Sequence, residues 1–518
     1  MPLPEGMLNP ILLFGAVTPL LLILILMAGF RRSVVEAGAA AWGVTLLLVF
    51  LLFGGNLRLV IFSQARAGWM ALEVLYIVWG ALLFHAVCEG AGVVSALGIG
   101  ISGGVRSRSL QVLALAWVFA SFLQGAGGFG VPVVVTSPLL MAIGFPPVQA
   151  VVLPAIGHAW AVTFGSLGTS FQALMTASGL PAAMLAPTAA LFLGVGCVLC
   201  GLLVGAMGLD RADFVRAIPV ILLIGTGMGA TQYILAVNGL WQIGSLGGGL
   251  AGLVIVFVVG KLLYRKAPSD PGQPTIKIRA GLAAYAWLIV VILAARLIDP
   301  IRAALQFGAW QPSFPQTVSN LGYTTSAEQG MMIAPFGHAG SLLIYSAAGA
   351  YILFSALGLL PRDAPRTILR RLFRAAVPVS LGILVMAGIS TLMSHAGMMF
   401  LLAEGFIRLA GPAFPLLSPW IGALGAFLTG SNTNSNLLFT PLQQRMAGRL
   451  GLPVALLLAG QTGGGAVGSV LSPAKVIVGS GVAGGKEVEG MVMRRLMRPV
   501  AILLLALTGL MGLFAIWG

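Results

Sequence analysis

Long apolar runs are the feature that most restricts how this chain of 518 residues can fold. Many of these runs reach roughly 20 residues, the length at which a helix crosses the hydrocarbon core of a bilayer. Only 8% of the residues are charged and 58% are hydrophobic, whereas about 25% are charged in a typical soluble domain. The composition excludes a soluble enzyme and a disordered chain. We expect an all-α integral membrane protein with about 12 to 16 crossings.

The net charge of +15 is typical of nucleic-acid-binding proteins. The basic residues, however, lie in short clusters between the apolar runs, which is the positive-inside pattern of a multi-pass membrane protein. We therefore predict contact with membrane lipid and no nucleic-acid partner. The clusters are Arg31 and Arg32; Arg106 and Arg108; Lys261, Arg265, Lys266, Lys277 and Arg279; the arginines of 362–374; and Arg494, Arg495 and Arg498.

All three cysteines lie in apolar stretches, and two of them, Cys197 and Cys200, form a CxxC pair. A redox motif needs an accessible thiolate, so we expect small packing residues here. The first apolar run precedes Arg31 and Arg32, whereas a cleaved signal peptide carries its positive charge before the run. The run is therefore interpreted as a retained span whose N-terminus lies outside.

The chain resembles itself when its two ends are compared. A collinear series of matches indicates two homologous halves, 35–206 and 340–518, with an N-terminal transmembrane segment at 1–34 and connecting segments at 207–339. The matching pairs are Ala91-Gly92 with Ala396-Gly397, Phe122-Leu123 with Phe427-Leu428, Gly125 with Gly430, Ser137-Pro138 with Thr440-Pro441, Gly144-Phe145-Pro146 with Gly451-Leu452-Pro453, and Gly165-Ser166-Leu167 with Gly468-Ser469-Val470.

Basic residues predict that the two halves have opposite orientations in the membrane. The loop 361–374 holds five arginines, whereas its counterpart 55–69 holds only Arg58 and Arg66. The next pair of loops behaves in the opposite way, because 104–109 is basic and 411–419 is uncharged. Inverted-topology repeats with broken or re-entrant helices are the architecture of secondary transporters.

The first half contains Gly125-Ala-Gly-Gly-Phe-Gly130, which formally satisfies the GxGxxG pattern. A dinucleotide site would need a strand before it and a helix after it, and this copy lies between apolar membrane segments. Glycine lowers helix stability by about 1 kcal/mol per residue relative to alanine, so we expect an unwound stretch instead. Such backbone is tolerated at membrane depth where protein or a water-filled cavity surrounds it.

The equivalent place in the second half is Gly430-Ser-Asn-Thr-Asn-Ser-Asn436, a polar stretch within an apolar run. Its amides and hydroxyls could bind a carboxylate or hydroxyl group, and its backbone N–H groups could bind an anion at the start of a half-helix. The alternative is a polar loop outside the membrane. The apolar flanks of the matching stretch 125–130 favour a site inside it.

A second polar cluster follows each interruption, at 163–170 and 461–469. Their pairing predicts that each half contributes two interrupted elements to one central site. The stretch 479–486 comes near a phosphate loop, but Ser480 stands where glycine is needed and Glu487 follows Lys486. We therefore predict transport driven by a gradient rather than by ATP, with no cofactor and no metal.

Ionisable residues inside membrane segments are functional candidates by default. Lys475 or His158 could balance the charge of a bound carboxylate. His85 and Glu89 are four residues apart and share a helical face, so this pair could exchange a proton, as could His395. For each residue alone, a structural hydrogen bond between helices is an equally good interpretation. The candidates are His85, Glu89, His158, Arg296, His338, His395, Glu404 and Lys475.

The stretches Phe122-Leu-Gln-Gly-Ala-Gly-Gly-Phe-Gly-Val-Pro132 and Phe427-Leu-Thr-Gly-Ser-Asn-Thr-Asn-Ser-Asn436 resemble the lactate permease family of bacteria. The resemblance covers most of the chain. It implies an inner-membrane symporter that carries small 2-hydroxymonocarboxylates (L-lactate, D-lactate, glycolate) together with protons. It also implies a wider kinship to ion-coupled transporters with Ser-Asn-Thr hairpins. Ser431-Asn432-Thr433 matches that hairpin, whereas Gly127-Gly128-Phe129 does not, which favours protons over sodium.

These observations together predict a transporter that binds one monocarboxylate between its broken segments. The alternatives are a sodium-coupled carrier of another organic anion, and an intramembrane enzyme or sensor, for which no acid–base or metal constellation is visible. His85, Glu89, His158 and His395 are the candidates for proton coupling. The predicted substrate-binding residues are Gln124, Gly125, Gly127, Gly128, Phe129, Gly130, Ser431, Asn432, Thr433, Asn434, Asn436, Thr462 and Lys475.

Overall fold

The structure is a computed structural model that describes residues 9–30, 32–104, 107–128, 130–263 and 275–517. Within these residues, 13 helices are long and apolar enough to cross a membrane, or 14 if the bent pair Pro147–Gly157 and Ala159–Ser178 forms one span. The expectation of an all-α, multi-pass membrane protein is therefore confirmed. Phe129 and the basic residues Arg31, Arg106, Arg265 and Lys266, all part of the sequence predictions, lie outside the described residues.

In its described residues, the N-terminal part of the chain forms ten α-helices. They are α1 (Pro10–Leu24), α2 (Val34–Leu51), α3 (Leu57–Gly90), α4 (Val93–Gly104), α5 (Arg108–Leu113), α6 (Ala120–Ala126), α7 (Val131–Ala142), α8 (Pro147–Gly157), α9 (Thr169–Ser178) and α10 (Ala182–Gly208).

Four helices and two short antiparallel strand pairs connect this part to the rest of the chain. The helices are α11 (Arg211–Val237), α12 (Gly244–Leu263), α13 (Thr275–Leu297) and α14 (Asp299–Leu305), and the strands are β1 (Ser313–Phe314), β2 (Thr317–Val318), β3 (Thr324–Thr325) and β4 (Glu328–Gln329). Strand β1 pairs with β4, and β2 pairs with β3.

Up to Trp517, the C-terminal part forms eight α-helices: α15 (Ala339–Ala356), α16 (Ala364–His395), α17 (Met398–Ala410), α18 (Phe414–Thr429), α19 (Asn432–Leu450), α20 (Val454–Gly468), α21 (Pro473–Gly481) and α22 (Lys486–Trp517). The elements from α16 to α22 follow the same order of long and short helices as those from α3 to α10, when α5 and α6 are counted as the single span Arg108–Ala126. The exact borders of the two halves and their inverted orientation stay predictions.

Polar residues in the loops fix where several of these helices begin. The Ser33 side chain accepts from the backbone of Glu36, whose carboxylate accepts from the Ser33 N–H, which is a capping box at the start of α2. Asn56 caps α3 through Leu59 N, and Asp210 caps α11 through Asp213 N. The long helices thus start at residues that satisfy their unpaired N–H groups.

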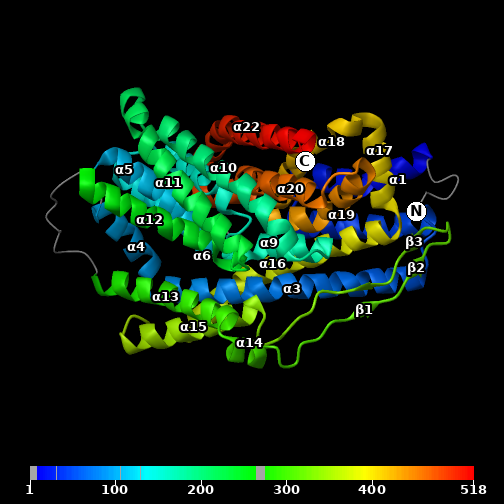
Figure 1. Ribbon diagram of the computed structural model, residues 1–518, viewed down its shortest axis with the longest axis horizontal. Helices are drawn as coiled ribbons and strands as arrows, with labels where there is room; N and C mark the ends of the chain where they lie inside the picture. Colours follow the sequence, from blue (N-terminus) through cyan, green and yellow to red (C-terminus); the bar gives the residue numbers. More distant parts are fainter. Residues whose placement is uncertain (1–8, 31, 105–106, 129, 264–274, 518) are drawn as a thin grey trace.

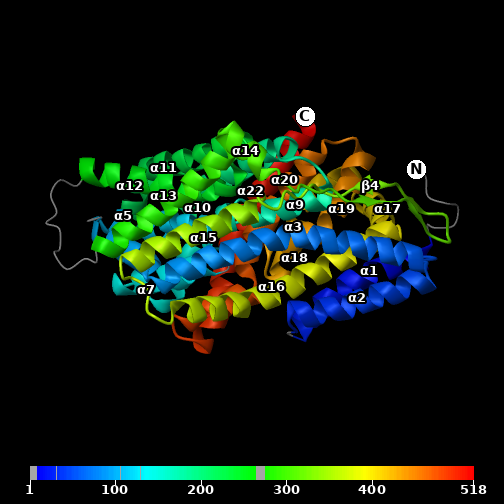
Figure 2. The ribbon, with the colours of Figure 1, turned by 90° about the horizontal axis from the view of Figure 1, so that it is seen from below.

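Helix α3 runs along one edge of the molecule between α15 and α16, and α2 lies against α16 (Figures 1 and 2). Helix α22 lies along the opposite edge in Figure 1 and packs on α8, α10, α18 and α20. Helices α9, α19 and α20 lie between these two edges and contact one another. Elements from both halves therefore enclose the same interior.

The strands lie beside the first half of α3 (Figure 2). The Trp69 ring packs edge-on against Trp310, with 4.7 Å between centroids, and its Nε1 donates to the carbonyl of Met331. Asn56, the cap of α3, donates to the carbonyl of Val318. The strand segment is thus fastened to α3 at several points along its length.

Glycines bring α18 and α20 into backbone contact. A side chain built at Gly422 would overlap the carbonyl oxygen of Gln461, and one at Gly464 would overlap that of Pro419. Gly468 lies equally close to the backbone of Ala423. Small residues every four positions allow this approach between membrane helices, so the two helices form one closely packed unit.

Replacing Gly464 by alanine should destabilise the protein, because the new methyl group has no space against Pro419. Overpacking of this kind costs about 1–3 kcal/mol. The matched control is Gly463→Ala, whose methyl group would meet only Leu507 at 3.5 Å, an ordinary contact. Thermal unfolding in detergent should show a lower apparent Tm for Gly464→Ala. Equal Tm values for the two variants would contradict the proposed backbone contact.

Candidate substrate site between two broken helices

The first predicted interruption lies between α6 and α7. Helix α6 continues to Ala126, Gly127 caps it, and Gly128 and Gly130 have positive φ angles of 61° and 90°. The unwound part is therefore shorter than the predicted stretch 125–130. Gly125 is still helical, and a side chain there would overlap the backbone of Leu246 in α12. Glycine is needed at this position for packing rather than for unwinding.

The second interruption lies between α18 and α19. Gly430 has a positive φ of 71°, and the Ser431 side chain caps α19 by accepting from Asn434 N at 3.4 Å. The polar residues that follow form the first turns of α19 and are buried: Asn432 is 1% exposed and Asn436 is fully buried. These residues are therefore the buried start of a helix and not a polar loop exposed on the surface of the protein.

Asn432 and Asn436 join the two halves of the chain through their side-chain nitrogens. Asn432 Nδ2 donates to the Thr163 hydroxyl at 3.1 Å and to the Thr462 carbonyl at 3.2 Å. Asn436 Nδ2 donates to the Ser170 carbonyl and to the Thr462 hydroxyl, both at 2.9 Å. All these side chains are buried. Residues of α19, α20 and the segment 163–170 thus form one hydrogen-bonded cluster.

Three further contacts connect the same segments. The hydroxyls of Thr163 and Thr462 lie 3.1 Å apart, and those of Ser170 and Thr433 lie 3.0 Å apart. Gln461 Nε2 donates to the Ser435 hydroxyl at 3.0 Å. The second polar cluster of each half, 163–170 and 461–469, therefore meets the start of α19.

The backbone of the segment 163–170 is strained. Ser166 and Leu167 have φ angles of 47° and 55°, and Gly168 follows at 81°. A residue other than glycine in this region costs about 1–3 kcal/mol, and such strain gathers at functional sites. A side chain at Gly128 would overlap the Ser166 hydroxyl. Both helix interruptions thus border this segment, although no described contact joins them directly.

Three amide oxygens of the cluster have no hydrogen-bond partner among the described residues, namely Oδ1 of Asn432, Asn434 and Asn436. The nitrogens of Asn432 and Asn436 hold these side chains in place, so both oxygens have fixed positions. An unpaired buried acceptor costs about 1–3 kcal/mol. The arrangement is suited to a ligand that brings a hydrogen-bond donor or a cation.

Lys475 and His158 lie on either side of a small cavity of about 10 Å³ that also borders Gly130. Lys475 Nζ donates to the Ser469 hydroxyl at 2.9 Å. His158 Nδ1 lies 2.6 Å from the carbonyl of Pro154, and its Nε2 has no partner among the described residues. A cavity of this size holds about one water molecule, so a small organic acid fits only after the surrounding elements move.

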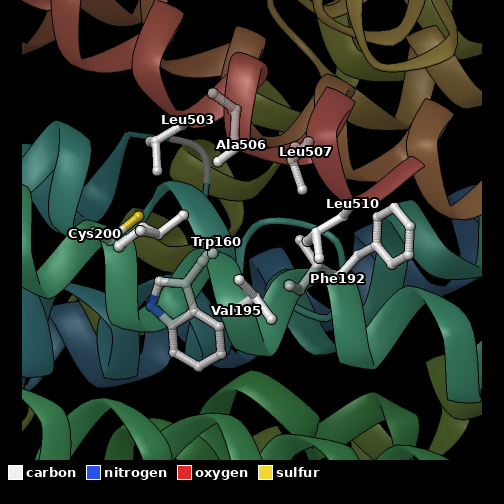
Figure 3. A pocket seen from close by; sticks show the side chains of 12 residues that line it. Trp160, Phe192, Val195, Cys200, Leu503, Ala506, Leu507 and Leu510 are labelled. Atoms are coloured by element: carbon white, nitrogen blue, oxygen red, sulfur yellow. The ribbon is translucent and has the colours of Figure 1, made fainter. Parts of the chain in front are cut away.

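A second cavity lies between α10, α20 and α22 (Figure 3). Its lining is apolar apart from the sulfur of Cys200, and Trp160 Nε1 donates away from it to the Ser121 hydroxyl. It offers no charge or donor to a carboxylate. Cys197 and Cys200 are free and buried. This cavity is therefore part of the packing and not a site for an anion.

His85 faces the first interruption, because a side chain at Gly127 would lie 3.1 Å from its Nδ1. Its Nε2 is 3.9 Å from a carboxylate oxygen of Glu89. Arg371 NH1 lies 3.5 Å from the same oxygen of Glu89, whose side chain is 53% exposed. His85 and Glu89 therefore lie close together as predicted, and Arg371 of α16 joins them as a third member of the group.

His395 belongs to a different group of residues, beside the strands. Its Nδ1 lies 3.2 Å from the Thr317 hydroxyl, and its Nε2 lies 3.8 Å from Glu328 Oε1. Arg66 NH1 is 2.5 Å from the same oxygen of Glu328. No described contact brings His395 to the cluster around Asn432.

The remaining predicted residues lie around this cluster. Gln124 lies beside Gly165, where a side chain would come within 2.9 Å of its Nε2. Asn434 faces α16, with its Nδ2 3.5 Å from the position of a side chain at Gly382. One buried carboxyl was not singled out from the sequence: Glu73, 1% exposed in α3. The sequence did indicate Glu73, because a carboxyl within the apolar segment 70–96 is a candidate functional residue.

Comparison with known proteins gives a consistent set of relatives. The sequence model of the L-lactate permease family matches residues 13–516. The L-lactate permease of Escherichia coli (strain K12) is 28% identical over 413 residues, which cover 73% of each chain. The glycolate permease of the same strain is 26% identical over 425 residues, or 74% of each chain. The solved YdaH transporter of Alcanivorax borkumensis aligns over 87% of this chain and 86% of its own with 16% identity and a TM-score of 0.47.

Replacing Thr163 by valine should destabilise the cluster, because the hydroxyl that accepts from Asn432 and contacts Thr462 is lost. A buried donor left unpaired costs about 1–3 kcal/mol. Thr226→Val is the matched control, since the exposed Thr226 hydroxyl bonds only to carbonyls of its own helix. The apparent Tm in detergent should fall for Thr163→Val and stay near wild type for Thr226→Val. An unchanged Tm for Thr163→Val would count against the cluster.

Proposed function

This chain belongs to the L-lactate permease family, and from this premise we propose that it is a proton-coupled symporter of small 2-hydroxymonocarboxylates. It is a multi-pass membrane permease and not an enzyme. L-lactate, D-lactate and glycolate are the proposed substrates. The lactate and glycolate permeases that it resembles support this substrate class, because both acids carry a carboxylate beside a hydroxyl group.

The observation that carries the proposal is the buried polar cluster where the two halves meet. A carboxylate needs donors or positive charge, and Lys475 and the first turn of α19 can supply them. The 2-hydroxyl group needs an acceptor, and the unpaired oxygens of Asn432, Asn434 and Asn436 can serve. The donors and acceptors of the site thus suit the two functional groups of the proposed substrate.

The small volume of the cavity beside Lys475 fits a transporter whose site widens when it opens to one side of the membrane. The segment 163–170 borders both interruptions and carries the strained residues Ser166 and Leu167. A change in this segment would alter the hydrogen bonds of Asn432 and Asn436 together. We infer that this segment and the start of α19 change their contacts when the substrate enters.

A sodium-coupled carrier of another organic anion is the second candidate. The three unpaired amide oxygens favour it, because cation sites in transporters with broken helices are built from oxygen ligands. A proton-coupled carrier uses the same oxygens for the hydroxyl group of its substrate. The driving ion therefore separates the two candidates.

Uptake of radiolabelled L-lactate into proteoliposomes tests the proposal. An inward proton gradient of about one pH unit should drive accumulation of up to about tenfold for one proton per lactate. A sodium gradient at equal pH should have no effect, and unlabelled glycolate should compete. Uptake that ignores the proton gradient would reject proton coupling, and a response to sodium would support the second candidate.

Replacing Lys475 by glutamine should weaken substrate binding, because the positive charge beside the cavity is removed. We expect the KM for L-lactate to rise at least about tenfold, which corresponds to about 1.4 kcal/mol. Lys475→Arg keeps the charge and should stay closer to wild type. An unchanged KM in Lys475→Gln would show that this lysine does not balance the substrate's charge.

A further inference from the structure

Glu73 is a carboxyl group buried in the interior of α3. Its side chain is 1% exposed, and its Oε2 has no hydrogen-bond partner among the described residues. The residues before and after it in α3 belong to an apolar cluster shared with α9, α16 and α19: Met70, Ala71, Val74, Leu75, Ala173, Ala177, Ile383 and Leu437. A carboxyl in such surroundings is costly when charged, so it is a functional candidate.

No basic side chain neutralises this carboxyl. Within the described residues, Glu89, Glu328 and Glu404 each lie within 4 Å of an arginine, whereas no ion pair includes Glu73. An isolated buried carboxylate is far less favourable than the neutral acid. Among the described residues, Glu73 therefore differs from Glu89, Glu328 and Glu404 in having no fixed counter-charge.

The elements packed against α3 also bring few titratable groups near it. Helices α4 and α9 and strand β2 contain none, and α16 contains none between 375 and 394. On the side of α15, Tyr76 stacks on His338 at 4.8 Å and donates to the carbonyl of Pro335, while Tyr345 and Tyr351 lie further along α15. The basic residues of α19 are Arg445, bonded to Tyr323, and Arg449, paired with Glu404.

Helix α9 leads from the neighbourhood of Glu73 to the polar cluster. The Glu73 carboxyl faces the side chain of Thr176, whose hydroxyl accepts from Gln172 Nε2 at 3.1 Å. Ser170, on the first turn of the same helix α9, contacts Thr433 and accepts from Asn436. The rise from Ser170 to Thr176 is about 9 Å along the helix axis.

We propose that Glu73 carries the coupled proton. This inference rests on the proposed function, which does not specify the residue that binds the coupled proton. The carboxyl takes up one proton when the site faces outward and releases it when the site faces inward, and one monocarboxylate anion moves with it. For coupling, the loaded carrier moves with Glu73 protonated, and the empty carrier returns with Glu73 deprotonated. Helix α9 lies between the two sites, since it packs on α3 around Glu73 and its Ser170 carbonyl accepts from Asn436.

The test uses the full chain in proteoliposomes and compares Glu73→Gln, Glu73→Asp and Glu487→Gln, whose glutamate is exposed near the start of α22. Glutamine has the shape of the protonated acid but cannot release a proton. We expect Glu73→Gln to lose accumulation driven by a proton gradient and to lose lactate-induced proton uptake. Exchange of internal for external lactate needs no net proton movement, so it should stay within about threefold of wild type. Glu73→Asp should recover accumulation, and Glu487→Gln should remain coupled.

The outcomes separate this inference from the proposed function. Wild-type uptake that does not depend on the proton gradient overturns the proposed function, and the role of Glu73 falls with it. If the wild type is proton-coupled and Glu73→Gln still accumulates lactate in response to the proton gradient, the role of Glu73 is overturned but the proposed function is not. A third outcome is that Glu73→Gln keeps the wild-type Tm but loses both exchange and accumulation. If Glu73→Asp also recovers neither, the role of Glu73 as proton carrier is overturned. Selective loss of accumulation supports the inference.

Discussion

The hydrogen bonds that Asn432 and Asn436 make to Thr163, Ser170 and Thr462 are the interaction on which the rest of the structure depends. Membrane helices gain little from burying apolar surface against lipid, so polar contacts inside the bundle decide which helices meet. Here two amides connect the strained segment 163–170 with α19 and α20. Their side-chain nitrogens make these contacts, whereas their Oδ1 atoms have no partner among the described residues. The proposed substrate site uses these unpaired oxygens.

Much of the fold could be predicted from the sequence. Apolar length and glycine content identified the membrane helices and both interruptions, because these depend on local backbone preferences. Pairing across the molecule was harder to predict. Symmetry suggested that 125–130 would face 431–436, whereas the contacts of α19 go to 163–170, and Gly125 is kept for packing on α12. Which side chains meet depends on tertiary packing, which internal repetition does not specify.

The ionisable residues illustrate the same limit. Lys475, His158 and His85 lie beside the interruptions, as expected from their neighbours in the sequence. His395 instead joins Glu328 and Arg66, because the strand segment lies against α3, an arrangement that no local pattern indicates. Conversely, Glu73 could have been noticed in the sequence as a carboxyl within an apolar segment. Its burial and its unpaired Oε2 among the described residues are seen only in the structure.

The glycine contacts between α18 and α20 have a consequence for how the protein can open. Two helices in backbone contact slide past each other only with difficulty, so α18 and α20 should move together as one rigid unit. The other side of α19 faces α9 through hydroxyls and amides, which can exchange partners with water or a bound acid at little cost. Widening should therefore begin along the α9–α19 face, with α18 and α20 following as one body.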